Sequence, residues 1–134
     1  MTVVDASIVV RLLQARAADQ GLRARFARER RLHAPALVDA EVTSAFRGLL
    51  LSSRSYAITS SRAADILEDY ADLPLVRHPM LPLQARVLKL RDHFTAHDAF
   101  YVALAEALDL PLLTDDRKFA GAPGHHATIE TWQR

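Results

Sequence analysis

Short apolar runs alternate along the chain with longer segments whose apolar residues recur every three or four positions. Uninterrupted short runs are typical of buried strands, whereas the longer spacing is typical of helices. Strands are therefore expected at residues 3–5, 32–34, 74–78, 111–114 and 128–131. Helices are expected at residues 6–17, 18–30, 36–52, 60–70, 79–90 and 97–110, with a short helical turn at 117–120. This alternation predicts an α/β domain of three layers, in which helices cover both faces of a mainly parallel central sheet.

Length and composition limit the possible classes of protein. The 134 residues suffice for one hydrophobic core, and no linker or repeat divides them, so one domain over residues 1–134 is expected. Cysteine is absent, which excludes disulfides and thiolate metal sites. No apolar run approaches the ~20 residues that span a bilayer, and no signal-peptide pattern is present. We therefore expect a cytoplasmic protein without membrane contact.

The charged residues are unevenly distributed, although the net charge is only +1. Seven arginines and two acids fall between positions 11 and 31, whereas five acids and no base fall between positions 98 and 116. The basic segment is compatible with a solvated helix face, with a surface that follows nucleic-acid phosphates, or with a groove for an acidic peptide. These three interpretations stay open at this point.

Asp5 interrupts the apolar run at the start of the chain, between Val4 and Ala6. An unpaired carboxylate buried there would cost several kcal/mol or would have to become protonated. A second apolar strand also ends in aspartate, at Asp115 and Asp116. The carboxyl ends of parallel strands meet at one edge of a sheet, where α/β domains bind their ligands. We therefore expect these carboxylates to lie close to one another.

Glu41 and Asp98 lie near the starts of two further predicted helices. Each could simply be a favourable acid in a first turn, with Thr95 as the cap before Asp98. Four carboxylates at one edge would, however, repel each other, by about 4 kcal/mol for a pair ~4 Å apart at an effective dielectric near 20. Such a cluster needs a divalent cation or shared protons. Oxygen ligands without cysteine suit Mg²⁺, with Mn²⁺ as an alternative.

Four motifs in this order resemble the acidic motifs of the PIN-domain family, and more narrowly the VapC-type toxins of toxin–antitoxin pairs. They are VVDAS, PALVDAEVTSAFR, TAHDAFYVALAEAL and PLLTDDRKF, and together they extend over almost the whole chain. The resemblance implies a PIN-like fold and a Mg²⁺-dependent endoribonuclease. It assigns the catalytic acids to Asp5, Glu41, Asp98 and Asp116. In this assignment Asp5, Asp98 and Asp116 hold the metal, and Glu41 is a ligand or orients a water.

The same resemblance identifies residues around these acids. Asp115 falls at the variable position of the fourth motif, and it remains a second candidate beside Asp116. Ser7 and Thr114 match hydroxyls that hold an acid or a metal-bound water in the family, although helix capping would also explain them. His97 is either an accessory base beside Asp98 or a solvated neighbour.

The resemblance also implies partners. They are an RNA substrate, a VapB-like antitoxin that sends a basic side chain into the acidic pocket, and a second copy of the chain in a homodimer. The two basic helices before residue 31 resemble the clamp that receives the antitoxin. Candidate dimer residues are Leu49, Leu50, Leu51, Tyr56 and Ile58, for which core packing is the alternative.

Three other functions remain open. The first is a PIN-type nuclease with a housekeeping role in RNA processing, which would use the same residues. The second is a catalytically silent module that binds a metal or a basic peptide. The third is a receiver-like phosphoacceptor, which needs a lysine near the end of a late strand. Lys118 follows Asp116 too closely to suit that role.

Overall fold

The computed structural model describes residues 1–54 and 57–133. Its strands are β1 (Thr2–Val4), β2 (Leu32–Pro35), β3 (Leu75–His78), β4 (Leu112–Thr114) and β5 (Ile129–Thr131). Its α-helices are α1 (Ala6–Gln14), α2 (Gln20–Ala27), α3 (Val38–Leu51), α4 (Ser60–Ala71), α5 (Gln84–Lys89), α6 (Ala96–Leu108) and α7 (Lys118–Gly121). Short 3₁₀ helices, η1 (Ala17–Asp19) and η2 (Leu81–Leu83), precede α2 and α5.

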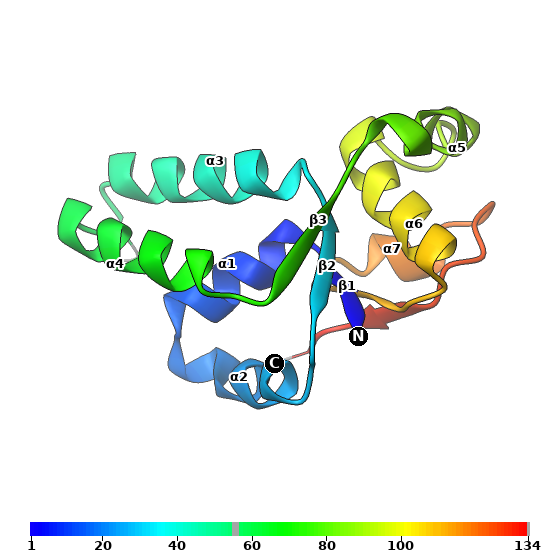
Figure 1. Cartoon of the computed structure of the whole chain (residues 1–134). Coiled ribbons are helices and arrows are strands. Elements are labelled where there is room, and N and C mark those ends of the chain that lie inside the picture. The colour runs from blue at the N-terminus through cyan, green and yellow to red at the C-terminus, as the bar shows by residue number, and fades with distance from the viewer. Residues whose placement is uncertain (55–56, 134) are drawn as a thin grey trace.

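The five strands form one sheet in the order β3-β2-β1-β4-β5, and every neighbouring pair is parallel. Val3 of the central strand pairs with His33 on one side and with Leu112 on the other. Helices α1, α3 and α4 cover one face, and α5, α6 and α7 lie on the other (Figure 1). The predicted three-layer α/β/α architecture is therefore confirmed. In the part of the chain that the structure describes, no helix is both long and apolar enough to cross a bilayer.

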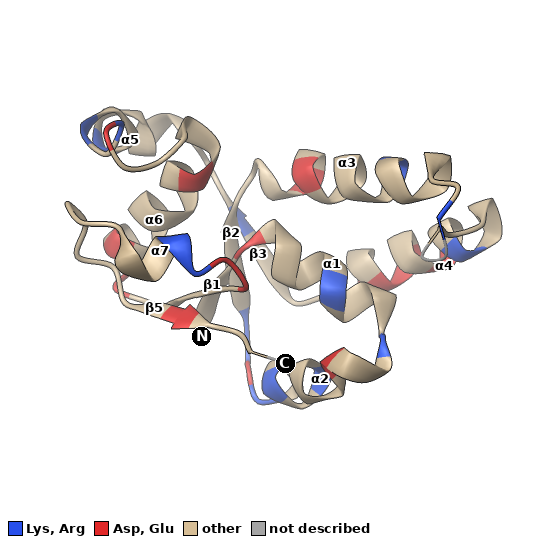
Figure 2. Cartoon of the chain, turned by 180° about the vertical axis from the view of Figure 1, so that it is seen from behind, with Lys and Arg blue, Asp and Glu red and all other residues tan. Residues whose placement is uncertain are grey.

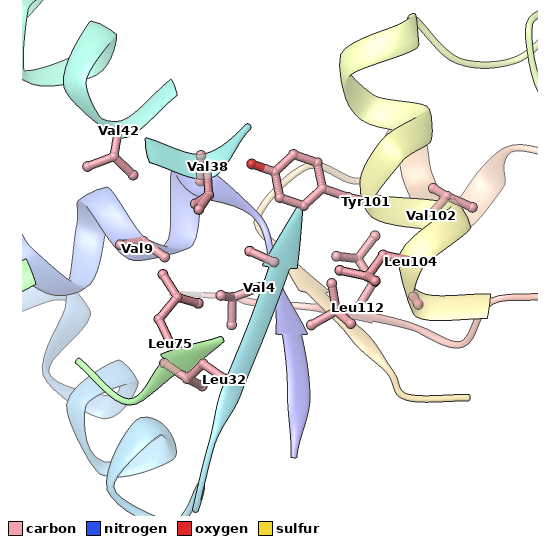
Figure 3. Close-up of a cluster of buried hydrophobic side chains, with 14 of the residues drawn as sticks. Val4, Val9, Leu32, Val38, Val42, Leu75, Tyr101, Val102, Leu104 and Leu112 are labelled. Carbon is pink, nitrogen blue, oxygen red and sulfur yellow. The ribbon is translucent and has the colours of Figure 1, made fainter. Parts of the chain in front are cut away.

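The core explains why the central strands are continuously apolar. Val4 and Leu112 are fully buried, because α1 packs on one face of the sheet and α6 on the other (Figure 3). The ring of Tyr101 on α6 lies in this core, and its hydroxyl points toward the start of α3 (Figure 3). All residues from 101 to 105 are buried, so α6 is the central helix of its layer.

The first two helices are shorter than predicted. The first was expected to extend to residue 17 but ends at Gln14, where Ala15 adopts a left-handed conformation with φ of 53°. The second was expected over residues 18–30, but η1 intervenes and α2 ends at Ala27. An ion pair accounts for the break, since the buried carboxylate of Asp19 turns back to bind Arg11 on α1. Helical spacing alone does not reveal such a long-range contact.

The fold brings the carboxyl ends of β1 and β4 together. Strand β1 leads directly into α1, and β4 leads into the loop before α7. Figure 2 shows the acidic positions of the β1–α1 junction, of this loop, of α3 and of the first turn of α6 around the same end of the sheet. The predicted position of the acids at this edge is confirmed.

Candidate functional site

A pocket of about 530 Å³ opens at this edge of the sheet. Five carboxylates from four separate parts of the chain line it, and the remaining lining residues are small apolar residues, one serine and one arginine. The lining residues are Asp5, Ala6, Ser7, Val10, Arg11, Glu41, Ala45, Asp98, Asp115 and Asp116. All four predicted catalytic acids therefore face one space, together with the second candidate Asp115 and the predicted neighbour Ser7.

Asp5 occupies the N-cap position of α1, but its side chain makes no capping hydrogen bond. Its Oδ2 instead accepts hydrogen bonds from the hydroxyls of Thr114, at 2.8 Å, and Ser7, at 3.2 Å. Burial is the largest influence on this carboxyl and raises its pKa, while the two hydrogen bonds lower it. The nearby charges of Asp98 and Asp115 raise the pKa again, and the result is about 6. In this structure the hydroxyls of Ser7 and Thr114 therefore both contact the Asp5 carboxyl.

Asp115 is held by two donors. Its Oδ1 accepts from Ser7 at 2.8 Å, so the single hydroxyl hydrogen of Ser7 is shared between Asp115 and Asp5. Its Oδ2 accepts from Arg11 Nη1 at 3.0 Å. The guanidinium of Arg11 also binds Asp19 at 2.7 Å, and the residue as a whole is only 9% exposed. Arg11 is therefore a buried counter-ion of the acidic site. Its inclusion in a solvated or RNA-contacting basic surface was wrong.

A second arginine of the basic segment also serves the fold. Arg25 forms ion pairs with Glu29, four residues later in the chain, and with Glu130 at the sheet edge. Glu29 in turn accepts a hydrogen bond from Thr2 at 2.7 Å. This cluster ties α2 to β1 and β5, so the Arg25 guanidinium is bound within the fold.

Asp98 and Asp116 share one cation. The ammonium of Lys118 lies 3.0 Å from Asp98 Oδ2 and 3.3 Å from Asp116 Oδ2. The backbone N–H of Lys118 also donates to Asp116 Oδ1 at 3.0 Å. The N-terminus of α6 is capped as expected, because Thr95 accepts a hydrogen bond from the Asp98 N–H. The carboxylate of Asp98 is thereby left for the pocket.

Glu41 projects into the pocket from the first turn of α3 and is fixed by α6. Its Oε1 accepts a hydrogen bond of 2.5 Å from the hydroxyl of Tyr101. Burial and this hydrogen bond raise the pKa of Tyr101, so the phenol stays protonated and donates. Sequence reasoning missed Tyr101, although it lies three residues after Asp98 and therefore on the same helix face.

The donor chemistry of the pocket fits a hard divalent cation, since carboxylates supply most of its polar groups. The acids are not arranged as a complete set of metal ligands in this structure. Within residues 1–54 and 57–133, no three acidic or histidine side chains stand close enough together to hold an ion as they are. The cations of Arg11 and Lys118 bind the carboxylates instead, so Lys118 would have to move for Asp98 and Asp116 to share a metal. His97 is exposed and does not line the pocket.

The sequence profile of the PIN domain matches residues 2–124. The chain belongs to the PIN-domain family. Ribonuclease VapC12 of Mycobacterium tuberculosis is 37% identical over 130 residues, which cover 97% of this chain and 98% of that protein. Ribonuclease VapC3 of the same species is 43% identical over 128 residues, which cover 93% of this chain and 90% of that protein. The resemblance to VapC-type PIN domains is confirmed.

Two solved structures have the same PIN fold. The first is of VapBC2 from Rickettsia felis bound to a promoter DNA fragment, with a TM-score of 0.65, 15% identity and 98% coverage of both chains. The second is of VapBC-5, a member of the VapBC family of toxin–antitoxin systems from M. tuberculosis. Its TM-score is 0.58 at 24% identity, with 97% of this chain and 95% of that chain covered. The receiver-like alternative was wrong, because its strand order is 2-1-3-4-5, whereas this sheet has the order 3-2-1-4-5.

Proposed function

We propose that this PIN domain is a Mg²⁺-dependent endoribonuclease and the toxin of a toxin–antitoxin pair, with Mn²⁺ as a possible substitute. The observation that carries the proposal is the convergence of Asp5, Glu41, Asp98 and Asp116 on one pocket. The relatives named as ribonucleases, aligned over nearly the whole chain, support the same activity. The proposed ligands are Asp5, Asp98 and Asp116, and Glu41 either completes the ligand set or orients a water.

Bound Mg²⁺ would supply the chemistry of lowering the pKa of a water and neutralising charge on the phosphodiester. The protein's part is to hold the acids in place. Thr114 and Ser7 orient the Asp5 carboxylate, and Tyr101 fixes Glu41 at the opposite wall of the pocket. In the hydrolysis, a water oxygen forms a bond to phosphorus, the bond to the leaving oxygen breaks, and that oxygen gains a proton. No side-chain nucleophile is required.

The antitoxin would act at the pocket and beside it. A groove of about 290 Å³ between α1 and α3 shares Val10 and Ala45 with the acidic pocket, and Leu49 forms part of its wall. A VapB-like segment that fills this groove can extend a basic side chain toward the carboxylates, where Lys118 already shows that a cation is accepted. The solved neighbours named as VapBC complexes support such a partner.

A homodimer remains part of the proposal. Leu50 and Leu51 are 41% and 68% exposed near the end of α3, so they are available for an interface. Leu49 and Ile58 pack against the hydrophobic core, which favours the core interpretation for these two. Tyr56, the remaining candidate, lies outside the described residues.

Cleavage of RNA by the purified protein tests the proposed activity. Wild-type protein should cut single-stranded RNA with Mg²⁺ or Mn²⁺ and should stop when a chelator is added. Asp98→Asn should lose at least ~100-fold in rate, since it removes a proposed metal ligand. The matched control is Asp109→Asn at the exposed end of α6, where asparagine tolerates the left-handed backbone (φ of 53°). Equal cutting by Asp98→Asn and wild type would contradict the proposal.

The toxin role and a housekeeping role share these residues and need a cellular test. Induced expression should arrest growth, and co-expression of the cognate VapB-like antitoxin should restore it. Growth that continues during expression of a protein that cuts RNA in vitro would favour RNA processing. Metal binding without any cutting would favour the silent module.

A further inference from the structure

A second pocket, of about 420 Å³, lies beyond Asp98. It is formed mainly by the segment between α5 and α6 together with the first residue of α7. Its lining residues are Arg91, Asp92, His93, Phe94, Thr95, Asp98 and Lys118. Because Asp98 lines both spaces, the two pockets are adjacent.

The charges of the second pocket differ from those of the first. Arg91 and Lys118 line the second pocket together with Asp92 and Asp98, whereas five carboxylates and one arginine line the acidic pocket. The ammonium of Lys118 also pairs with Asp98 and Asp116 of the acidic pocket, so Arg91 is the cation that belongs to the second pocket alone. Arg91 is anchored at one end, since its Nη1 donates to the Leu88 carbonyl at 2.8 Å. The rest of the planar guanidinium remains able to contact a phosphate.

The imidazole of His93 in the second pocket is held in place by the loop that follows α7. A Cβ atom added at Gly124, where φ is 87°, would lie only 3.1 Å from Cδ2 of His93, so the imidazole packs closely on this glycine. The loop itself is anchored to α6, because Glu106 accepts a hydrogen bond from the backbone N–H of His126, and to α5, because Arg86 donates to the Gly124 carbonyl at 3.1 Å. His93 is exposed at the surface, while its position is fixed from behind.

We propose that the second pocket binds the ribonucleotide adjacent to the scissile phosphate, with Arg91 on its phosphate and His93 stacked on its base. This inference rests on the proposed ribonuclease function. Single-stranded RNA is commonly bound by bases stacked on aromatic or histidine rings and by cations along the backbone. The volume lies within the range of pockets that hold small organic ligands, about 300–1,000 Å³. The α1–α3 groove on the other side of the acids is lined largely by apolar atoms of Val10, Ala45 and Leu49, which suits a peptide rather than a nucleotide.

Binding of a labelled single-stranded RNA oligonucleotide in EDTA tests this subsite independently of cleavage. The variant is Arg91→Gln, and the matched control is Lys89→Gln. Lys89 is exposed, lies two residues earlier, carries the same charge and lines neither pocket. Arg91→Gln should weaken binding ~5- to 10-fold and reduce the slope of log K against log salt by about 0.7, the value for one contact to a single strand. Lys89→Gln should change binding less than ~2-fold.

A second readout uses the cut sites in a randomised RNA. His93→Ala should relax the base preference at one position next to the cut. Steady-state cleavage kinetics give a third readout, in which Arg91→Gln should raise KM with kcat nearly unchanged. Equal weakening by Arg91→Gln and Lys89→Gln, or no RNA binding by the wild type, would overturn the subsite. If the wild type cuts RNA and the two variants behave alike, the subsite is wrong and the proposed function stands. If the wild type binds through Arg91 but never cuts, RNA binding by this pocket stands, whereas the proposed function fails and with it the placement beside a scissile phosphate.

Discussion

The ammonium nitrogen of Lys118 lies 3.0 Å from Oδ2 of Asp98, inside the cluster of carboxylates. A second contact of 3.3 Å to Asp116 means that this one cation joins two of the three proposed metal ligands. The pKa of Lys118 is raised by these two neighbours, the contact with Asp98 first, so the amine is charged. Lys118 thus reduces the repulsion between the acids in the protein without metal.

Lys118→Met should therefore strengthen metal binding. The lysine competes with an incoming cation for Asp98 and Asp116, and its side chain is 59% exposed, so each contact is weak. We expect Mn²⁺ affinity to rise roughly 2- to 10-fold, measured by calorimetry or by the loss of the free Mn²⁺ resonance signal. Lys89→Met, the corresponding change at the only other lysine, should leave the affinity unaltered. Unchanged or weaker binding in Lys118→Met would show that the lysine does not compete.

Asp5→Asn should stabilise the protein at neutral pH when no metal is present. The pKa of Asp5 is about 6 in the folded protein and near 3.8 in the unfolded chain, so the folded state binds more protons between these values. Wild-type stability must then fall as pH rises from about 4 to 6, by up to about 3 kcal/mol from this carboxyl. Urea unfolding in EDTA at pH 4 and pH 7 measures this. The two proteins should differ little at pH 4, and equal stabilities at pH 7 would contradict a buried, unneutralised Asp5.

Thr114→Val replaces a buried hydroxyl with a methyl group, so the side chain keeps nearly the same shape. The hydroxyl donates to Asp5 at 2.8 Å and accepts from the Asp116 N–H at 3.1 Å. Its loss should cost about 1–3 kcal/mol of unfolding free energy and raise the Asp5 pKa, which carboxyl ¹³C shifts can follow. The control is Thr43→Val, because Thr43 is exposed on α3 and its hydroxyl donates to the carbonyl of Asp39 in its own helix. A loss no larger than that of the control would contradict the role of Thr114.

Arg11→Met tests whether the buried arginine is structural. Its removal leaves Asp19, which is 5% exposed, without the two hydrogen bonds that Arg11 now donates to it. Breaking a buried pair in this way costs about 3–5 kcal/mol. Arg23→Met on α2 is the control, since Arg23 is exposed. Urea unfolding measures the free energy of unfolding of both variants, and Arg11→Met should lose far more than Arg23→Met. A loss below about 1 kcal/mol for Arg11→Met would show that the charges of Arg11 and Asp19 are solvated.

Several features of the site followed from the sequence alone. The apolar strands before Asp5 and Asp115 had to be buried, and parallel strands place their carboxyl ends together, so the meeting of these acids was predictable. The cap at Thr95 was visible from its spacing to Asp98. Both predictions depend on local pattern and on one rule of sheet topology.

The counter-ions of the acids could not be predicted in the same way. Arg11 looked like one of seven arginines in a basic segment, and only the turn at Ala15 brings Asp19 back to it. The position of the Lys118 ammonium depends on how α7 begins after Asp116. Tyr101 is different, because its helical spacing from Asp98 could have revealed that it faces the site.

Binding of Mn²⁺ by the wild type and by Asp98→Asn, followed together with RNA cleavage, tests the central claim most directly. The claim is that the acids at the carboxyl ends of β1 and β4, with Asp98, hold the metal on which cleavage depends. The account predicts that the cleavage rate of the wild type rises with its Mn²⁺ saturation. It also predicts that Asp98→Asn loses at least ~10-fold in Mn²⁺ affinity, since it removes a charged ligand. Full-rate cleavage in EDTA, or equal Mn²⁺ affinity in the two proteins, would contradict it.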